Sequence, residues 1–422
     1  MAEQTHPSTW DEHDLERRLL GTLDIAARAV SVLAPDGYVD VDRPEQRLTS
    51  EKVVSETAVL LLAAARVLRP VIKERLDTIA RLLIPHAQGD RVRALICMEP
   101  SLALDHGLAH ACLSRLGYRD AELDRLLGKI LSSQHAVGHE RLPNRELEQV
   151  WARSLCDFVT PADRGGPAIL RRSMPCIGID ALSSSRDDVY SFTHALMYAT
   201  DLGSRVPKLP RARRDILADA EAALARCLDE DDYDLGAEVL WAWPMLHSGW
   251  TASAIFGFTV LTAVEDAAGF LPNASVRLDR YRELSGEARS RYALATAYHT
   301  AYAMGVLCAT ALGSGCLPAR DVPTSRHERG SAAAILGLIA GADARSHWRR
   351  CLDELKPAQQ DALAPLLMAM SLRHAAVCRD FPLLKASLEM AVRYRVLVGP
   401  SPRQAADLLG RAATLSLSVR LG

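Results

Sequence analysis

The sequence predicts an all-α fold, and three observations support this class. Apolar residues recur at spacings of three and four over most of the 422-residue chain. Capping residues, Pro and Gly separate these periodic segments, whereas no segment alternates apolar and polar residues as a half-buried strand would. Hydrophobic residues make up 49% of the chain, which is enough for a large core. We therefore expect a single all-helical domain over residues 1–422.

The predicted helices follow one another through short connections. The first begins near Glu12 and ends before Pro35, and Thr49 caps the second. Pro70 begins the third helix and Pro85 ends it, and the very short join before Pro70 predicts an antiparallel hairpin. In order, the predicted helices cover residues 12–33, 49–68, 70–83, 100–116, 119–133, 144–157, 187–203, 211–227, 232–247, 251–268, 286–312, 330–341, 345–354, 357–376, 380–395 and 402–418.

Two architectures fit such a series of helices. One is an α/α toroid, a helical barrel of antiparallel helix pairs whose inner ring surrounds a cavity, and the other is an open α-solenoid. Very apolar helices alternate with charged ones, as inner and outer rings would, and the sequence lacks the repeated consensus expected of a solenoid. The toroid is therefore the leading prediction. The irregular stretches 158–184 and 270–285 predict loops over the cavity mouth, or a seam between two subdomains in the first case.

Charge, cysteine content and missing motifs limit the function. Lys plus Arg number 50 against 52 for Asp plus Glu, so there is no excess positive charge to bind nucleic acid or an anionic membrane. The nine Cys lack CxxC spacing, the N-terminus is polar, and no apolar run reaches membrane-spanning length. We expect a cytoplasmic protein with free thiols and no membrane insertion, and the Ala, Leu and Arg content is typical of a GC-rich bacterial genome. Dinucleotide, P-loop and hydrolase motifs are absent.

Residues 185–203 predict a helix whose polar face carries groups able to exchange protons. Ser185 suits the N-cap and Gly203 the end. Spacings of three and four place a set of polar side chains on one face: Asp187, Tyr190 or Ser191, His194, Tyr198 and Asp201. Because a solvent-facing helix would carry Lys, Arg and Glu there, we interpret this face as the wall of a polar cavity. The alternative is a buried helix whose Tyr and His bond to neighbouring groups.

Residues 228–244 place acids at the start of an apolar helix. The helix dipole alone explains carboxylates at this position. However, crowded carboxylates cannot all ionise freely, so one of them can retain a proton and act as a general acid. We predict Asp231 and Asp232 for this role, with Glu238 and Trp241 further along the same helix lining the cavity.

The run Asp229-Glu230-Asp231-Asp232 resembles the D-x-D-D motif of class II terpene cyclases. The resemblance implies an α/α barrel in which the motif begins an inner helix, and it implies that Asp231 is the protonating acid. The sequence departs from that family in carrying Tyr233 where Thr is usual, in lacking Gln-Trp repeats and in its short length. The toroid of lanthipeptide cyclases is similar in size, but its Cys and Cys-His ligand motifs are not matched.

Residues 292–305 predict a second apolar helix with proton-exchanging groups. Tyr298 and Tyr302 share a face with His299 beside it, and the segment contains no Lys or Arg. We predict no metal and no cofactor. The alternative metal site would use two histidine pairs, and these are His106 with His110, and His135 with His139.

We therefore expect an enzyme of specialised metabolism that carries out acid/base chemistry on a small-molecule or peptide substrate, such as a cyclisation or an elimination. Asp231 or Asp232 would deliver a proton, His194 or His299 would accept one, and the tyrosines would orient the substrate. One alternative is a helical-repeat adaptor or regulatory protein that binds a peptide or protein partner. Another is a peptide-modifying enzyme similar to lanthipeptide cyclases. The sequence gives no oligomeric state.

Overall fold

The computed structural model describes residues 10–34, 37–38, 49–133, 140–158, 166–206, 208–273, 276–324, 327–339 and 346–421. These residues form helices and no β-strand, so the all-α class is confirmed. No helix in these ranges is both long enough and apolar enough to cross a bilayer.

Most of the predicted helices are confirmed to within a few residues. The first half of the described chain contains α1 (Glu12–Ser31), α2 (Ser50–Ala64), α3 (Pro70–Ala87), α4 (Asp90–Met98), α5 (Ala103–Arg115), α6 (Ala121–Leu131), α7 (Pro143–Leu155), α8 (Gly166–Arg171), α9 (Met174–Ile177) and α10 (Arg186–Thr200). The second half contains α11 (Arg213–Asp229), α12 (Tyr233–Leu240), α13 (Ala242–Met245), α14 (Ala252–Ala268), α15 (Leu278–Glu283), α16 (Gly286–Ser314), α17 (Ser331–Leu336), α18 (His347–Asp353), α19 (Pro357–Ala362), α20 (Ala364–Val377), α21 (Phe381–Arg393) and α22 (Pro400–Leu421).

Some boundaries differ from the prediction for identifiable reasons. α3 continues through Pro85 to Ala87, because a proline in the last turn removes only one hydrogen bond and its fixed φ suits a helix. The short helices α4, α8, α9 and α15 were not predicted, since each is too short to show an apolar period. α10 ends at Thr200, and its C-cap Asp201 adopts the left-handed conformation two residues before Gly203, the residue predicted to end the helix.

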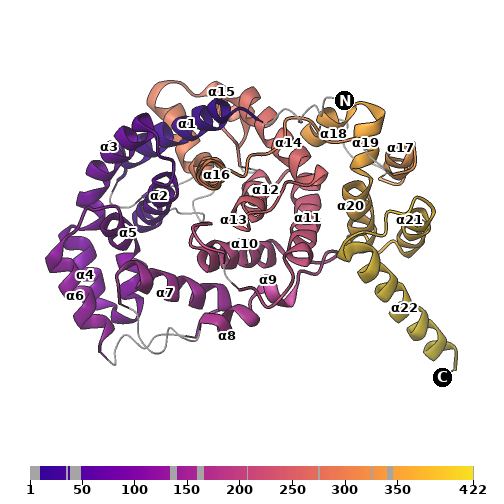
Figure 1. Ribbon diagram of the computed structural model, residues 1–422, viewed down its shortest axis with the longest axis horizontal. Helices are drawn as coiled ribbons and strands as arrows, with labels where there is room; N and C mark the ends of the chain where they lie inside the picture. The colour runs from indigo at the N-terminus through magenta and orange to yellow at the C-terminus, as the bar shows by residue number, and fades with distance from the viewer. Residues whose placement is uncertain are drawn as a thin grey trace, which may run out of the picture.

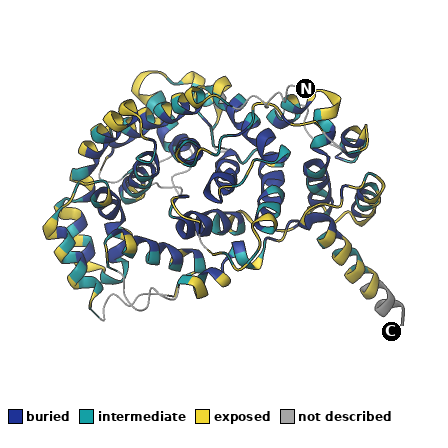
Figure 2. Ribbon diagram, viewed as in Figure 1, coloured by how far each residue is buried: buried dark blue, intermediate teal, exposed yellow. Residues whose placement is uncertain are grey.

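Six helices pack against one another in a closed cycle. α2 contacts α5, α5 contacts α7, α7 contacts α10, α10 contacts α12, α12 contacts α16, and α16 returns to α2 (Figure 1). Other helices cover the outside of this cycle: α1 lies on α16, α3 on α2 and α5, and both α11 and α14 on α12. The central helices are mostly buried and the peripheral ones carry the exposed residues (Figure 2).

The C-terminal helices extend the molecule on one side of the cycle. α20 packs on α11 and α18 packs on α14, and α22 projects away from the other helices towards the C-terminus (Figure 1). Residues 158–184, predicted as a possible subdomain seam, include the short helices α8 and α9, which contact α7 and α10. The single-domain assignment stays a prediction.

Candidate functional site

A cavity of about 1110 Å³ lies among the six helices of the cycle, and each of them contributes to its wall. One lining residue from each helix illustrates this arrangement: Glu56 of α2, Leu108 of α5, Glu148 of α7, His194 of α10, Glu238 of α12 and His299 of α16. Residues distant in sequence therefore meet in one space. The cavity holds both charged and aromatic side chains.

Charge is graded along the cavity wall. The cationic side chains Lys52, Arg145 and Arg186 are about half exposed, at 50%, 46% and 49%. The acidic side chains Asp234 and Glu238 are only 6% and 1% exposed. These three cations therefore lie towards solvent, whereas a fourth, Arg226, is 9% exposed and paired with Glu230. The most deeply buried charged groups of the cavity are acids.

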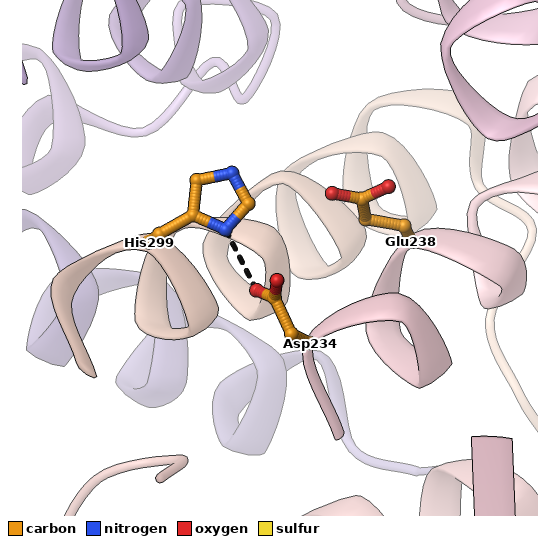
Figure 3. Close-up of side chains that lie close together, drawn as sticks. All are labelled: Asp234, Glu238 and His299. Atoms are coloured by element: carbon orange, nitrogen blue, oxygen red, sulfur yellow. Dashed lines mark hydrogen bonds and ion pairs between the residues drawn. The ribbon is translucent and has the colours of Figure 1, made fainter. Parts of the chain in front are cut away.

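Asp234 and His299 form an ion pair between α12 and α16. The Asp234 Oδ1 atom lies 2.7 Å from His299 Nδ1 (Figure 3). The same oxygen accepts a second hydrogen bond of 3.1 Å from the Thr300 hydroxyl. Burial alone would lower the pKa of His299, but the Asp234 and Glu56 carboxylates outweigh it and raise that pKa to about 10. Burial alone would raise the pKa of Asp234, yet the charges of His299 and Arg186 hold it well below its usual range. Both groups are thus charged at neutral pH.

Arg186 ties the start of α12 to the start of α10. Its Nη2 atom donates to Asp234 Oδ2 over 2.8 Å, and its Nε atom donates to Asp232 Oδ2 over 3.2 Å. Asp232 is also the N-cap of α12, because its other oxygen accepts from the Leu235 amide. Asp232 is therefore engaged in holding the helix start and the guanidinium.

Glu238, one turn after Asp234, is a buried acid with one carboxyl oxygen that makes no hydrogen bond. Its Oε2 atom accepts a hydrogen bond of 2.8 Å from the Thr193 hydroxyl and lies 3.5 Å from His194 Nδ1. Its Oε1 atom is buried and has no hydrogen-bond partner. Burial, followed by the negative charge of Asp234, raises the pKa of Glu238 to about 8. Glu238 therefore carries a proton at neutral pH.

Asp234, Glu238 and His299 also have the residue types of a metal-ligand set. One ligand atom from each lies within 4.8 Å of the other two, as the convergence in Figure 3 shows. However, the Asp234 oxygens already accept from Arg186, Thr300 and His299, and the His299 atom nearest the carboxylates is the one bonded to Asp234. The arrangement is that of an ion pair next to a protonated acid.

An aromatic cluster adjoins Glu238 and is centred on His194. The His194 ring stacks on Tyr190 at 3.7 Å, and its centroid lies 6.1 Å from that of Tyr198 and 6.2 Å from that of Trp241. Burial, then the positive charges of Arg145 and His299, lower the pKa of His194 to about 3. His194 is therefore neutral, unlike His299.

Hydrogen bonds fix the other tyrosines of the wall. Tyr298 donates to Glu56 over 2.6 Å, and the Tyr302 hydroxyl lies 2.9 Å from that of Thr57. Tyr198 donates to Glu148 over 2.7 Å. These bonds connect α16 to α2 and α10 to α7, so they hold neighbouring inner helices together as well as shaping the wall.

Ten of the twelve predicted site residues line the cavity: Asp187, Tyr190, His194, Tyr198, Asp232, Glu238, Trp241, Tyr298, His299 and Tyr302. Asp231 and Asp201 do not. Asp231 lies before the N-cap of α12 and accepts a hydrogen bond of 2.7 Å from the Tyr233 hydroxyl. Asp201 is the C-cap of α10 and accepts from the Trp151 indole over 2.6 Å. Each points to a local partner that fixes a helix end.

The predicted histidine pairs do not form a metal site among the described residues. His106 bonds to Glu99 over 2.9 Å, while His110 lies between Gln88 and Asp124. His135 and His139 lie outside the described residues.

The cavity residues that were not predicted include Glu56, Arg145, Glu148, Arg186 and Asp234. Asp234 had a readable signal, since Asp234 and Glu238 are spaced i, i+4 on an otherwise apolar helix and so share a face. Glu56 and Glu148 lie on helices that carry other charges, so nothing in their local pattern distinguishes them from solvent-facing acids.

Comparison with known protein families places most of the chain in one family. The family described as Domain of unknown function (DUF6895) matches residues 19–309. The chain belongs to the DUF6895 family. The matched region runs from within α1 to near the end of α16, so it contains all six helices of the cycle and all the residues that line the cavity. Neither the curated proteins nor the solved structures gave a match, and the resemblance to terpene cyclases finds no support.

Proposed function

We propose that this protein is an α/α-toroid enzyme of specialised metabolism that carries out non-redox acid/base chemistry in its central cavity. The toroid is supported by the cyclic packing of α2, α5, α7, α10, α12 and α16. In an open solenoid the first and last helices of such a row would lie far apart, whereas α2 and α16 pack together. The substrate is a small molecule or a peptide that enters past the half-exposed cations.

One observation carries the catalytic part of this proposal. Glu238 lines the cavity, is almost completely buried, holds a proton at neutral pH and has an oxygen without a partner. A general acid needs a pKa near the working pH and access to the substrate atom that it protonates. In this proposal Glu238 takes the acid role that the sequence suggested for Asp231 or Asp232.

The Asp234–His299 pair supports this role by its charge. Its carboxylate helps to keep the proton on Glu238, because a second negative charge in a buried space is unfavourable. When Glu238 releases its proton, the nearby His299 imidazolium stabilises the carboxylate that forms. The reaction class that fits is proton transfer coupled to cyclisation or elimination, which would make the enzyme a cyclase or a lyase.

The test compares substrate conversion by matched variants. Purified wild-type protein, Glu238→Gln and Glu221→Gln are incubated with fractionated extracts of small molecules and peptides, and products are followed by mass spectrometry. Glu221 is a suitable control because it is also a largely buried glutamate, bonded to Thr251 and Ser253 and outside the cavity lining. We expect product masses that appear with the wild type and Glu221→Gln but not with Glu238→Gln. Equal products from Glu238→Gln would refute the acid role.

A further inference from the structure

Glu238 differs from the other buried carboxylates of the cavity in its partners. Asp234 has Arg186, and Glu148 has Arg145, with a nitrogen–oxygen distance of 2.8 Å in each case. Glu238 has only the Thr193 hydroxyl and the neutral His194 within reach, and no Lys or Arg lies within 4 Å of it in the described part of the chain. The described part of the chain thus places no Lys or Arg beside Glu238, and the charged His299, with a ring nitrogen within 4.8 Å of a Glu238 oxygen, is already paired with Asp234.

The charge of the whole lining also favours a cation. The lining includes seven Asp and Glu side chains, of which Glu238 is protonated at pH 7, against four Lys and Arg and the charged His299. Those cations are half exposed or already paired with other acids, as Arg186 and Arg145 are. A positively charged ligand group is therefore attracted to the deep end, where Glu238 lies.

The rings near Glu238 present the right surface for such a group. Tyr198 and Trp241 both lie about 6 Å from His194, which itself contacts Glu238. Four of the ten tyrosines in the chain line this cavity. Aromatic faces attract organic cations, most strongly where water is excluded, and the neutral His194 does not repel them.

We propose that the deep end of the cavity binds an ammonium group of the substrate, whose N–H donates to Glu238 Oε1 while Tyr198 and Trp241 contact its carbon substituents. This inference deepens the proposed function and rests on it, because it names the substrate class as an amine. In the bound state Glu238 regains a proton from the ammonium N–H, which leaves the amine neutral, before it acts as the acid. A divalent metal is less suited to the position, since the Asp234 and His299 atoms that would complete its coordination are bonded to each other.

The proposal implies a proton exchange that can be counted. Aliphatic amines are protonated at pH 7, with a pKa near that of lysine, at about 10.4. Glu238 is also protonated at pH 7. When the ammonium binds, the Glu238 O–H bond breaks, the proton passes to the buffer and the carboxylate accepts the ammonium N–H. No group is oxidised or reduced in this step. Close to one proton, about 0.9, is therefore released per amine bound at pH 7, and about 0.1 at pH 9.

Isothermal titration calorimetry tests this directly with three probes of one shape: cyclohexylamine, cyclohexanol and cyclohexanecarboxylate. Titrations in phosphate and in Tris, which differ in ionisation enthalpy, give the number of protons released. We expect the amine to bind at least ten-fold more tightly than the alcohol or the carboxylate. We expect Glu238→Gln to lose at least ten-fold in amine affinity together with the proton release, and Glu221→Gln to keep both.

Three results would overturn the inference: equal affinity for amine and alcohol, amine binding without proton release at pH 7, or unchanged amine binding by Glu238→Gln. Saturable binding of Zn²⁺ or Mn²⁺ that depends on Glu238, without amine binding, would assign the position to a metal and overturn it as well. These readouts need no turnover. A protein that binds amines through Glu238 but converts no substrate would therefore contradict the proposed function while leaving this inference standing.

Discussion

The Thr193 hydroxyl on α10 donates a hydrogen bond of 2.8 Å to Glu238 Oε2 on α12. This bond crosses two neighbouring inner helices and occupies one of the two carboxyl oxygens. It therefore leaves Oε1 as the oxygen without a partner, and it also opposes the rise in the pKa of Glu238 caused by burial. The position of Thr193 thus determines which oxygen of Glu238 is available to a ligand.

Thr193→Val should remove this bond without changing the side-chain volume. Because a buried polar atom then loses its partner, we expect the free energy of unfolding to fall by about 1–3 kcal/mol. The pKa of Glu238 should rise further, since the hydroxyl no longer favours the carboxylate. Chemical denaturation at pH 7 measures the first effect, and Thr193→Ser should restore most of the stability. A Thr193→Val protein as stable as the wild type would show that the bond contributes nothing.

Glu238 should make the protein less stable as the pH rises. Its folded-state pKa of about 8 lies above the ordinary glutamate pKa of 4.5, so the folded state binds more protons than the unfolded state between these values. Stability should therefore decline from pH 4.5 to pH 8, and Glu238→Gln should remove this decline. We expect the melting temperature of Glu238→Gln relative to the wild type to be higher at pH 9 than at pH 5. The exposed Glu389→Gln serves as the control, with a difference that does not depend on pH.

His299 should cause a second loss of stability, at higher pH. Its folded-state pKa of about 10 exceeds the ordinary histidine pKa of 6.5, so its contribution to stability is complete below pH 6.5 and disappears as the pH passes 10. A wild-type protein that is equally stable at pH 6 and pH 10 would contradict the assigned charge of both groups.

Asp234→Asn should lower the free energy of unfolding more than His299→Gln does. Removing the Asp234 charge takes from the buried His299 its 2.7 Å partner, leaving Glu56 at 3.6 Å, and takes from Arg186 one of its two carboxylates. Loss of one partner of a buried ion pair typically costs about 3–5 kcal/mol. Removing His299 leaves Asp234 bonded to Arg186 and Thr300, so the loss should be smaller. Urea unfolding of the two variants at pH 7 gives the comparison. If His299→Gln proves the less stable variant, Arg186 is not the second support of Asp234 that the geometry indicates.

The sequence predicted the helices well because local patterns determine them. Ser185 and Thr49 cap helices as expected, and each accepts the amide hydrogen bond that a cap should. The faces of α10 and α16 were likewise readable, since His194 and His299 stand out on apolar stretches, 189–200 and 292–305, that contain no Lys or Arg. Residues close by in the sequence determine both the helix caps and these helix faces.

The chemistry of the site depended on pairings that the sequence does not show. Asp231 and Asp232 look like the crowded acids, yet one bonds to Tyr233 and the other caps α12 and binds Arg186. The acid that holds a proton is Glu238, because it is buried opposite Asp234 and no Arg reaches it. Partners from α7, α10 and α16 decide these differences, and helices distant in sequence meet only in the folded chain.

The close packing of α16 on its neighbours leaves no room for a side chain at Gly305. Gly305 of α16 faces α1 and α2, where an added Cβ atom would overlap Thr22 Cγ2 of α1 and lie 3.0 Å from Leu60 Cδ1 of α2. Alanine normally favours a helix over glycine by about 1 kcal/mol, but the overlap here should reverse the sign and destabilise Gly305→Ala by about 1–3 kcal/mol. Gly410 of α22 is the matched control, because nothing lies within 4 Å of its added Cβ, so Gly410→Ala should stabilise the protein slightly. Thermal denaturation of both variants checks the prediction. Stabilisation of both would mean that α1 and α16 do not pack this closely, and α16, which carries His299, would then be less firmly held against its neighbours than the cavity geometry requires.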